Sequence, residues 1–245
     1  LKKQLKEYHF SFDTKTDEEI ILYGFLHYGV EFFKQLDGVF SFALLDENAQ
    51  NLYLVRDGFG CKPLFYAHLN ETVIFATELK AILAHPYVKP VVGKAGLNEI
   101  FSLGPARSLG SGVFENVFEV NPGEWIRISP YGLYKETYWR MKAAPHEDSY
   151  KETIEKTSQL VTDAIKKQSI HEGTLGSLLS GGVDSSIVTA VGSKLISKAG
   201  ETFKTFSFDY TDNKEYFQSN SFQPSLDRPY VDIMVNALGT KHTYL

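Results

Sequence analysis

The chain has 245 residues, of which 43% are hydrophobic and 22% charged, so it can build one large or two modest folded domains and is not a disordered segment. Its formal net charge of −5 argues against nucleic-acid or anionic-membrane partners, which need a clustered basic face. It has no long apolar run, no signal-like start and a single cysteine, Cys61. We therefore expect a soluble, cytoplasmic protein with small-molecule ligands and no membrane partner.

The first 140 residues predict helices packed with antiparallel strands. Thr16 and Glu19 have the spacing of a capping box, which predicts a helix that ends at Gly29. The apolar segments 38–45 and 52–55 predict a hairpin buried on both faces. We expect four further features downstream: a second hairpin of the same sheet from 64–66 and 73–75 around Asn70 and Glu71, a short helix over 79–84, short strands between 87 and 140, and a flexible loop at 110–112.

The pattern changes after Trp139, and residues 141–148 predict an interdomain linker. Ser149 and Glu152 form a second capping-box pattern, ahead of a helix whose apolar stripe holds Tyr150, Ile154, Thr157, Val161, Ala164 and Ile165. A strand (175–179), a helix (185–196), a strand (203–208) and a helix (227–238) then follow. This alternation predicts a parallel sheet wound by crossover helices.

The segment Leu178–Ser186 has the strongest chemical signal. An apolar strand runs into Ser180, Gly181 and Gly182 and then into a helix, so backbone N–H groups and a helix N-terminus can cradle phosphate. No lysine follows the glycines, and Asp184 stands in the loop instead. A carboxylate among phosphate-binding donors is explained if it holds a divalent ion, so the loop predicts ATP with Mg²⁺. The alternative is an ordinary strand-to-helix turn.

The other candidate residues are ambiguous from sequence. Phe208 ends the next strand and either flanks an adenine ring or belongs to the core. Asp17 either stabilises a helix N-terminus or binds a substrate ammonium group. Arg56 and Asp57 are interpreted as a local pair in a surface turn. No base stands at a recognisable spacing from Cys61, which we do not expect to be a nucleophile, and the histidines have no metal-ligand spacing.

Several motifs together resemble a known family. Asp37–Ala43, Arg56–Tyr66 and Phe75–Ala81 resemble the later part of class II glutamine amidotransferase domains, and Ser180–Ser186 resembles the pyrophosphate loop of ATP pyrophosphatases. In this order the whole chain is similar to bacterial-type, glutamine-hydrolysing asparagine synthetase. The resemblance implies an α/β fold class, in which Ntn-type β-sheet layers of an α+β glutaminase part (1–140) and a linker (141–148) precede the start of a parallel-sheet ATP-binding domain (149–245).

The resemblance also implies residue roles. The parent enzyme would activate aspartate with ATP as the β-aspartyl adenylate and amidate it with ammonia from glutamine, releasing AMP and pyrophosphate. Asp17 matches the acid that binds the glutamine α-amino group. The ATP and pyrophosphate site would consist of Leu179, Ser180, Gly181, Gly182, Asp184, Ser185, Ser186 and Phe208, with Asp184 also holding Mg²⁺. Many family members carry a smaller aliphatic residue in place of Phe208. A homodimer is compatible with the resemblance.

The family's N-terminal catalytic cysteine, its glutamine-binding arginine and its oxyanion pair would lie upstream of Leu1, and a later acidic loop would lie beyond Leu245. We therefore expect both ends to be truncations and the fragment itself to be inactive. Two alternatives stay open. One is another adenylating amide-forming ligase of the β-lactam synthetase type. The other is a non-catalytic nucleotide-binding homologue.

Overall fold

The computed structural model describes residues 1–70, 72–170, 173–198, 200–221 and 224–245, and it forms two compact units, Leu1–Ala144 and Pro145–Leu245. Each unit is described by itself. Among the described residues, no helix has the length and apolar character needed to cross a membrane.

The first unit begins with α1 (Lys2–Glu7), α2 (Asp17–Tyr28) and the 3₁₀ helix η1 (Gly29–Gln35). Helix α2 has the predicted limits, and it ends where Gly29 takes a φ of 62°. The predicted capping box at its start is wrong, because the Thr16 side chain caps no backbone N–H. Glu19 instead reaches back beyond the helix and accepts hydrogen bonds of 2.8 Å from the backbone N–H groups of Asp13 and Thr14.

An antiparallel sheet in the order β1-β2-β6-β7 forms the centre of this unit, with β1 (Ser41–Asp46), β2 (Asn51–Arg56), β6 (Glu124–Ser129) and β7 (Gly132–Thr137). The predicted first hairpin is confirmed, with Phe42 opposite Val55. Burial on both faces holds for much of β2 but not for β1, where Leu45 is 59% exposed. The second sheet packs on β2 and β6, and β1 lies at the edge.

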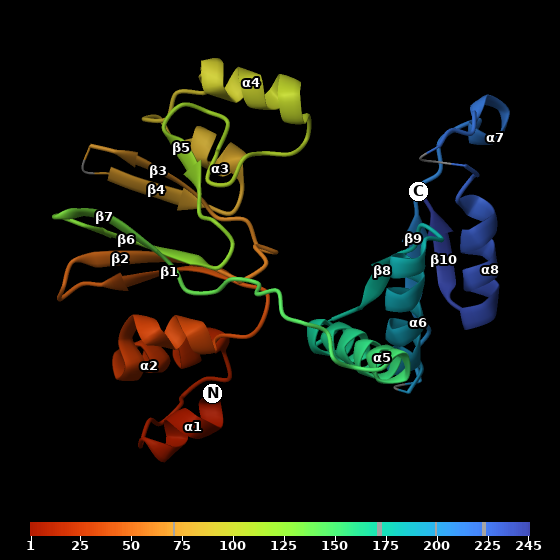
Figure 1. Cartoon of the computed structure of the whole chain (residues 1–245), viewed down its shortest axis with the longest axis horizontal. Coiled ribbons are helices and arrows are strands. Elements are labelled where there is room, and N and C mark those ends of the chain that lie inside the picture. The colour runs from red at the N-terminus through yellow and green to blue at the C-terminus, as the bar shows by residue number, and fades with distance from the viewer. Residues whose placement is uncertain (71, 171–172, 199, 222–223) are drawn as a thin grey trace. The chain divides into compact units, whose positions relative to one another are not determined.

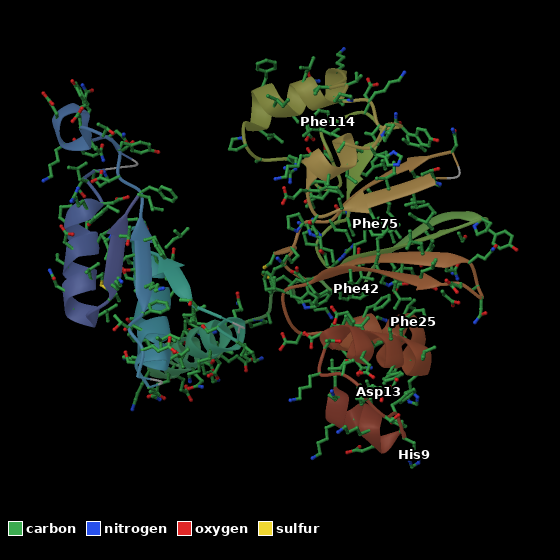
Figure 2. All side chains as sticks on the ribbon, turned by 180° about the vertical axis from the view of Figure 1, so that it is seen from behind. His9, Asp13, Phe25, Phe42, Phe75 and Phe114 are labelled. Carbon is green, nitrogen blue, oxygen red and sulfur yellow. The ribbon has the colours of Figure 1, made fainter. Side chains whose placement is uncertain are left out.

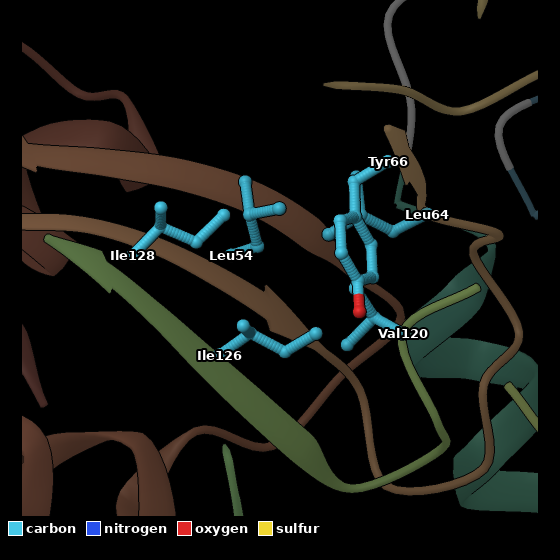
Figure 3. Packing of buried hydrophobic residues seen from close by; sticks show 6 residues of the cluster. All are labelled: Leu54, Leu64, Tyr66, Val120, Ile126 and Ile128. Carbon is cyan, nitrogen blue, oxygen red and sulfur yellow. The ribbon is translucent and has the colours of Figure 1, made fainter. Parts of the chain in front are cut away.

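The predicted second hairpin forms, but in a separate sheet. Strands β3 (Phe65–Leu69), β4 (Thr72–Ala76) and β5 (Val117–Glu119) form an antiparallel sheet in the order β4-β3-β5. The turn at 57–63 moves the chain to this second layer, and Glu71 lies outside the described residues. One core cluster lies between the two layers; its buried members are Leu54, Leu64, Tyr66, Val120, Ile126 and Ile128 (Figure 3).

Helices cover the outer sides of both sheets, so the first unit is built in layers (Figure 1). Helix α2 and η1 pack on the first sheet through an aromatic cluster, in which Phe25 of α2 and Phe42 of β1 take part (Figure 2). The predicted short helix forms as α3 (Leu79–Leu83), and it packs against β3 and β4 of the second sheet. Helix α4 (Lys94–Leu103) was not predicted from the sequence.

The second unit confirms the predicted alternation of helices and parallel strands. It contains α5 (Tyr150–Gln168), β8 (Gly176–Leu178), α6 (Val183–Ser197), β9 (Lys204–Ser207), α7 (Asn213–Tyr216), α8 (Arg228–Leu238) and β10 (Lys241–Tyr244). The strands pair in parallel in the order β10-β9-β8. The capping box of Ser149 and Glu152 is formed at the start of α5. No residue of α5 is buried, and Tyr150 of its apolar stripe is 84% exposed.

Candidate functional site

The Ser/Gly loop lies where β8 gives way to α6, at the carboxyl edge of the parallel sheet. Leu179 anchors its start, because the Leu179 N–H donates to the Phe206 carbonyl at 2.8 Å and the Ser207 hydroxyl donates to the Leu179 carbonyl. The Leu179 side chain is 1% exposed. The backbone that follows is therefore held at a fixed place at the end of the strands, where ligands bind in open α/β sheets.

The two glycines of the loop meet different surroundings. Gly181 has a φ of +79°, and a Cβ there would lie 2.7 Å from the Cβ of Tyr230 on α8. Gly182, the N-cap of α6, has an ordinary φ of −70°, and a Cβ there would meet only the Ser180 hydroxyl at 3.5 Å. The fold therefore requires glycine at 181. At 182 it leaves open space beside the helix N-terminus, which suits the close approach of an anion.

Serine hydroxyls hold the loop in shape. The Ser180 N–H donates to the Ser185 hydroxyl at 3.3 Å, and the two hydroxyl oxygens lie 3.1 Å apart. The Ser185 hydroxyl in turn donates to the Gly182 carbonyl at 3.2 Å, and the Ser186 N–H donates to the same carbonyl at 3.0 Å. These contacts join the loop to the first turn of α6.

A cavity of about 520 Å³ opens beside this loop, at the carboxyl ends of the three strands. It brings together four predicted nucleotide residues, namely Leu179, Ser180, Ser185 and Phe208. Phe208 is 72% exposed, which excludes the core-aromatic alternative for it. Gly181, Gly182 and Ser186 belong to the same loop but do not line the cavity.

Asp184 is separated from that cavity. It is exposed in the first turn of α6, next to the loop, and it lines a neighbouring groove of about 460 Å³ with residues of α5, β8 and α6. Within the described ranges, no group of three or more His, Cys, Asp or Glu residues could hold a metal. Mg²⁺ bound with a nucleotide commonly takes only one or two carboxylates, and phosphate oxygens and water complete its shell. The exposed carboxylate fits that minimal role.

A polar group at the cavity wall was missed by the sequence reasoning. Asp209 accepts hydrogen bonds from Asn213 Nδ2 at 3.1 Å and from Arg228 Nη1 at 2.8 Å. These two bonds, the one from Asn213 first, lower the pKa of the Asp209 carboxyl. The Arg228 guanidinium also lies 4.3 Å from the centre of the Tyr244 ring. The position of Asp209, two residues beyond the last residue of β9, was the signal that could have identified it.

Asp17 lies in the first turn of α2 with an exposed side chain. It lines a cavity of about 450 Å³ together with Lys2 and the segment 35–40, and it makes no described hydrogen bond or ion pair. An exposed carboxylate at a cavity can accept hydrogen bonds from a ligand ammonium group. The structure therefore leaves both the helix-stabilising and the ligand-binding interpretation of Asp17 in place.

Arg56 and Asp57 are not a local pair in a surface turn, as the sequence suggested, because both are buried. Arg56 forms an ion pair with Glu119 at 2.9 Å and donates to the carbonyls of Gly60, Lys62 and Val120.

The Asp57 carboxylate accepts backbone N–H bonds from Phe59, Cys61 and Lys62 at 3.0 to 3.1 Å. The Cys61 side chain itself is exposed, and no described hydrogen bond joins it to a base. Arg56 therefore binds carbonyl groups of the turn between β2 and β3, and Asp57 binds N–H groups of the same turn.

Comparison with known proteins matches the two compact units to different families. Residues 1–139 match the glutamine amidotransferase domain family, and residues 156–245 match the asparagine synthase family. The glutamine-hydrolyzing asparagine synthetase 3 of Bacillus subtilis is 37% identical over 243 residues, which cover 99% of this chain and 40% of that protein. The human glutamine-hydrolyzing asparagine synthetase is 27% identical over 96% of this chain and 42% of its own length.

The chain thus spans about two fifths of the length of these relatives. Among solved structures, the glutamine phosphoribosylpyrophosphate amidotransferase of B. subtilis has a TM-score of 0.41 at 12% identity, covering 99% of this chain and 57% of that one. The chain belongs to the glutamine amidotransferase domain family, whose match covers residues 1–139, more than half of its length.

Proposed function

We propose that the full-length protein makes asparagine from aspartate, with ATP as the activating substrate and glutamine as the nitrogen source. The observation that carries this proposal is the Ser/Gly loop beside a cavity at the carboxyl edge of the parallel sheet, in a chain whose first unit is an amidotransferase domain. The names of the similar B. subtilis and human proteins support it.

The second unit would supply the activation step. An oxygen of the aspartate β-carboxylate attacks the α-phosphorus of ATP, the bond to the β-phosphate breaks, and pyrophosphate leaves. In this proposal Ser180, Gly181, Gly182, Ser185 and Ser186 hold the β- and γ-phosphates by N–H and O–H donors, and Leu179 and Phe208 contact the nucleoside. Ammonia then attacks the acyl carbon, and AMP leaves. The adenylation step is needed because a free carboxylate is a poor acyl donor until AMP serves as its leaving group.

Asp184 is the residue we assign to Mg²⁺, which when bound would neutralise part of the triphosphate charge. Asp184 contributes one exposed carboxylate next to the loop. This carboxylate would otherwise repel the phosphates, so its place next to the loop is explained by a cation between them. The remaining ligands would come from the phosphates and from water.

In the first unit, Asp17 is the residue we assign to glutamine. Its exposed carboxylate lines a cavity and makes no described contact that a substrate would have to break. An ammonium group bound there would gain a charge-assisted hydrogen bond. Glutamine would then be held in the first unit by the charge of its α-amino group.

The test is an asparagine-formation assay on the full-length protein with aspartate, ATP, Mg²⁺ and either glutamine or ammonium. We expect asparagine and pyrophosphate with both nitrogen sources. Asp184→Ala should lower the rate with both by about 100-fold or more, because charge stabilisation by a bound metal is worth several kcal/mol. Asp163→Ala, which removes a partly exposed carboxylate from α5, should change the rate little.

Asp17→Ala tests the first unit independently of the second. It should raise the KM for glutamine and leave the ammonium-dependent rate unchanged. If the protein makes no asparagine with either nitrogen source, the proposal is wrong.

A further inference from the structure

The cavity beside the Ser/Gly loop contains one cationic side chain among its described lining residues, and this is Arg228. The loop itself offers only neutral hydroxyl and N–H donors, while Asp209 and Asp227 bring negative charge to the same wall. A nucleoside triphosphate carries several negative charges, and nearby carboxylates weaken its binding because like charges repel. A cation on the same wall would offset that repulsion.

Arg228 is held in place from two sides. Its Nη1 donates to the Asp209 carboxylate at 2.8 Å, and its guanidinium carbon lies 4.3 Å from the centre of the Tyr244 ring. A guanidinium has five N–H donors. Within the described part of the chain its Nε and Nη2 atoms donate to no protein acceptor, and 43% of the side chain is exposed. Donors therefore remain available for a ligand.

The backbone links Arg228 to the loop. Arg228 is the first residue of α8, and Gly181 packs against that first turn. A Cβ at Gly181 would lie 2.7 Å from Tyr230 Cβ and 3.1 Å from the Asp227 carbonyl oxygen. The glycine therefore lets the start of α8 approach the phosphate loop closely. This contact places the arginine and the loop on the same cavity.

We propose that Arg228 binds the terminal phosphates of the nucleoside triphosphate and that Asp209 positions it. This inference rests on the proposed function, since it assigns a residue to the ATP site of that reaction. A guanidinium fork can donate two parallel hydrogen bonds to phosphate oxygens, which a lysine cannot do. The arrangement favours ATP over AMP, because only ATP carries phosphates beyond the α-position.

The experiment measures the binding of ATP and, separately, of AMP to the full-length protein by equilibrium dialysis, with Mg²⁺ and without aspartate. Arg228→Met should weaken ATP binding by about tenfold to a hundredfold, the range for lost hydrogen bonds to a charged group. AMP binding should change less than about twofold. Arg228→Lys, which keeps the charge and loses the fork, should fall between the wild type and Arg228→Met for ATP.

Lys241→Met is the matched control, because Lys241 is exposed at the opposite end of β10 and does not line the cavity. It removes the same charge and should leave ATP binding unchanged. Equal losses of ATP and AMP binding in Arg228→Met would indicate a merely structural role and overturn the inference, as would unchanged ATP binding. Wild-type protein that binds no ATP would overturn the proposed function itself.

Discussion

Two adjacent glycines in the loop between β8 and α6 show how differently neighbouring positions can be constrained. Gly181 has a positive φ and a would-be Cβ contact of 2.7 Å with Tyr230, while Gly182 has neither constraint. In a sequence motif both positions are simply glycine, and the motif does not show which of the two is needed for packing. Position 181 serves the packing of α8, and position 182 keeps open the space in which we place a phosphate.

Gly181→Ala should lower the free energy of unfolding by about 2–4 kcal/mol, because it combines a left-handed backbone with overpacking against α8. Gly182→Ala should cost only about 0.5 kcal/mol, the weaker N-cap. In ATP dialysis, however, Gly182→Ala should bind markedly less ATP, since its Cβ points into the open space. If the two variants have the same unfolding midpoint, Gly181 is not needed for packing in the way described here.

Tyr138 makes a partly buried polar contact that no sequence motif predicts. Its hydroxyl donates to the Arg56 carbonyl at 2.6 Å, and burial, followed by the charge of Asp57, raises its pKa. The folded state therefore keeps the phenol proton at a pH where the unfolded chain, with a pKa near 10, releases it. The stability from this group is complete below pH 10 and is lost as the pH rises further.

Tyr138→Phe should cost about 1–3 kcal/mol at pH 7, because the buried carbonyl loses its donor. The difference from wild type should narrow by about 1.4 kcal/mol per pH unit above 10. Urea unfolding at pH 7 and pH 11 measures both effects. A constant difference at the two pH values would show that the hydroxyl does not keep its proton on folding.

At the scale of elements, two copies of one sequence signal had different outcomes. Thr16 with Glu19 and Ser149 with Glu152 share the capping-box spacing, yet only the second pair forms the box. Glu19 has better partners nearby, since its carboxylate accepts from two backbone N–H groups and the hydroxyl of Thr14. Local spacing predicted both helices correctly, and competition from the residues just before α2 decided the hydrogen bonds of Glu19.

Ser149→Ala should therefore destabilise α5 by about 1 kcal/mol, the usual cost of a lost side-chain cap. The same change at Thr16 should cost clearly less, because that side chain caps no N–H. Amide hydrogen exchange in the first turns of α5 and α2 measures both effects within one protein. Equal acceleration in the two helices would contradict the different capping described here.

Other elements separate what periodicity can and cannot predict. The parallel pairing of β8 and β9 follows from the alternation of strand and helix segments along the second unit. The assignment of β3 and β4 to a second sheet did not follow, because the turn at 57–63 decides the layer. That turn is held by buried charges, whose partners, such as Glu119 for Arg56, lie far along the chain.

At the scale of the whole molecule, the chain forms two compact units, and an exposed segment connects them. Residues 140–147 are exposed and belong to no helix or strand, in agreement with the contact boundary after Ala144. The nucleotide residues were predicted as one set, but Asp184 and Ser180 line different hollows. Sequence order alone could not show that division, since it depends on which side chains of other elements surround each residue.

Limited trypsin digestion of the full-length protein should cleave first after Arg140 or Lys142, because an extended, exposed backbone fits a protease best. N-terminal sequencing should then find fragments that begin at Met141 or Ala143. Replacing both basic residues by Gln should delay this first cleavage. Earlier cleavage inside either unit would contradict a boundary between the two units after Ala144.

The contacts of Arg56 also set an order of events during synthesis. The residues that complete its surroundings, Val120 and Tyr138, are 64 and 82 positions further along the chain. At a synthesis rate of about 5–20 residues per second, the ribosome needs roughly 3–13 s to add the 64 residues up to Val120. During that interval the Arg56 guanidinium lacks its acceptors Glu119 and Val120, so the nascent first unit should be the form that chaperones engage.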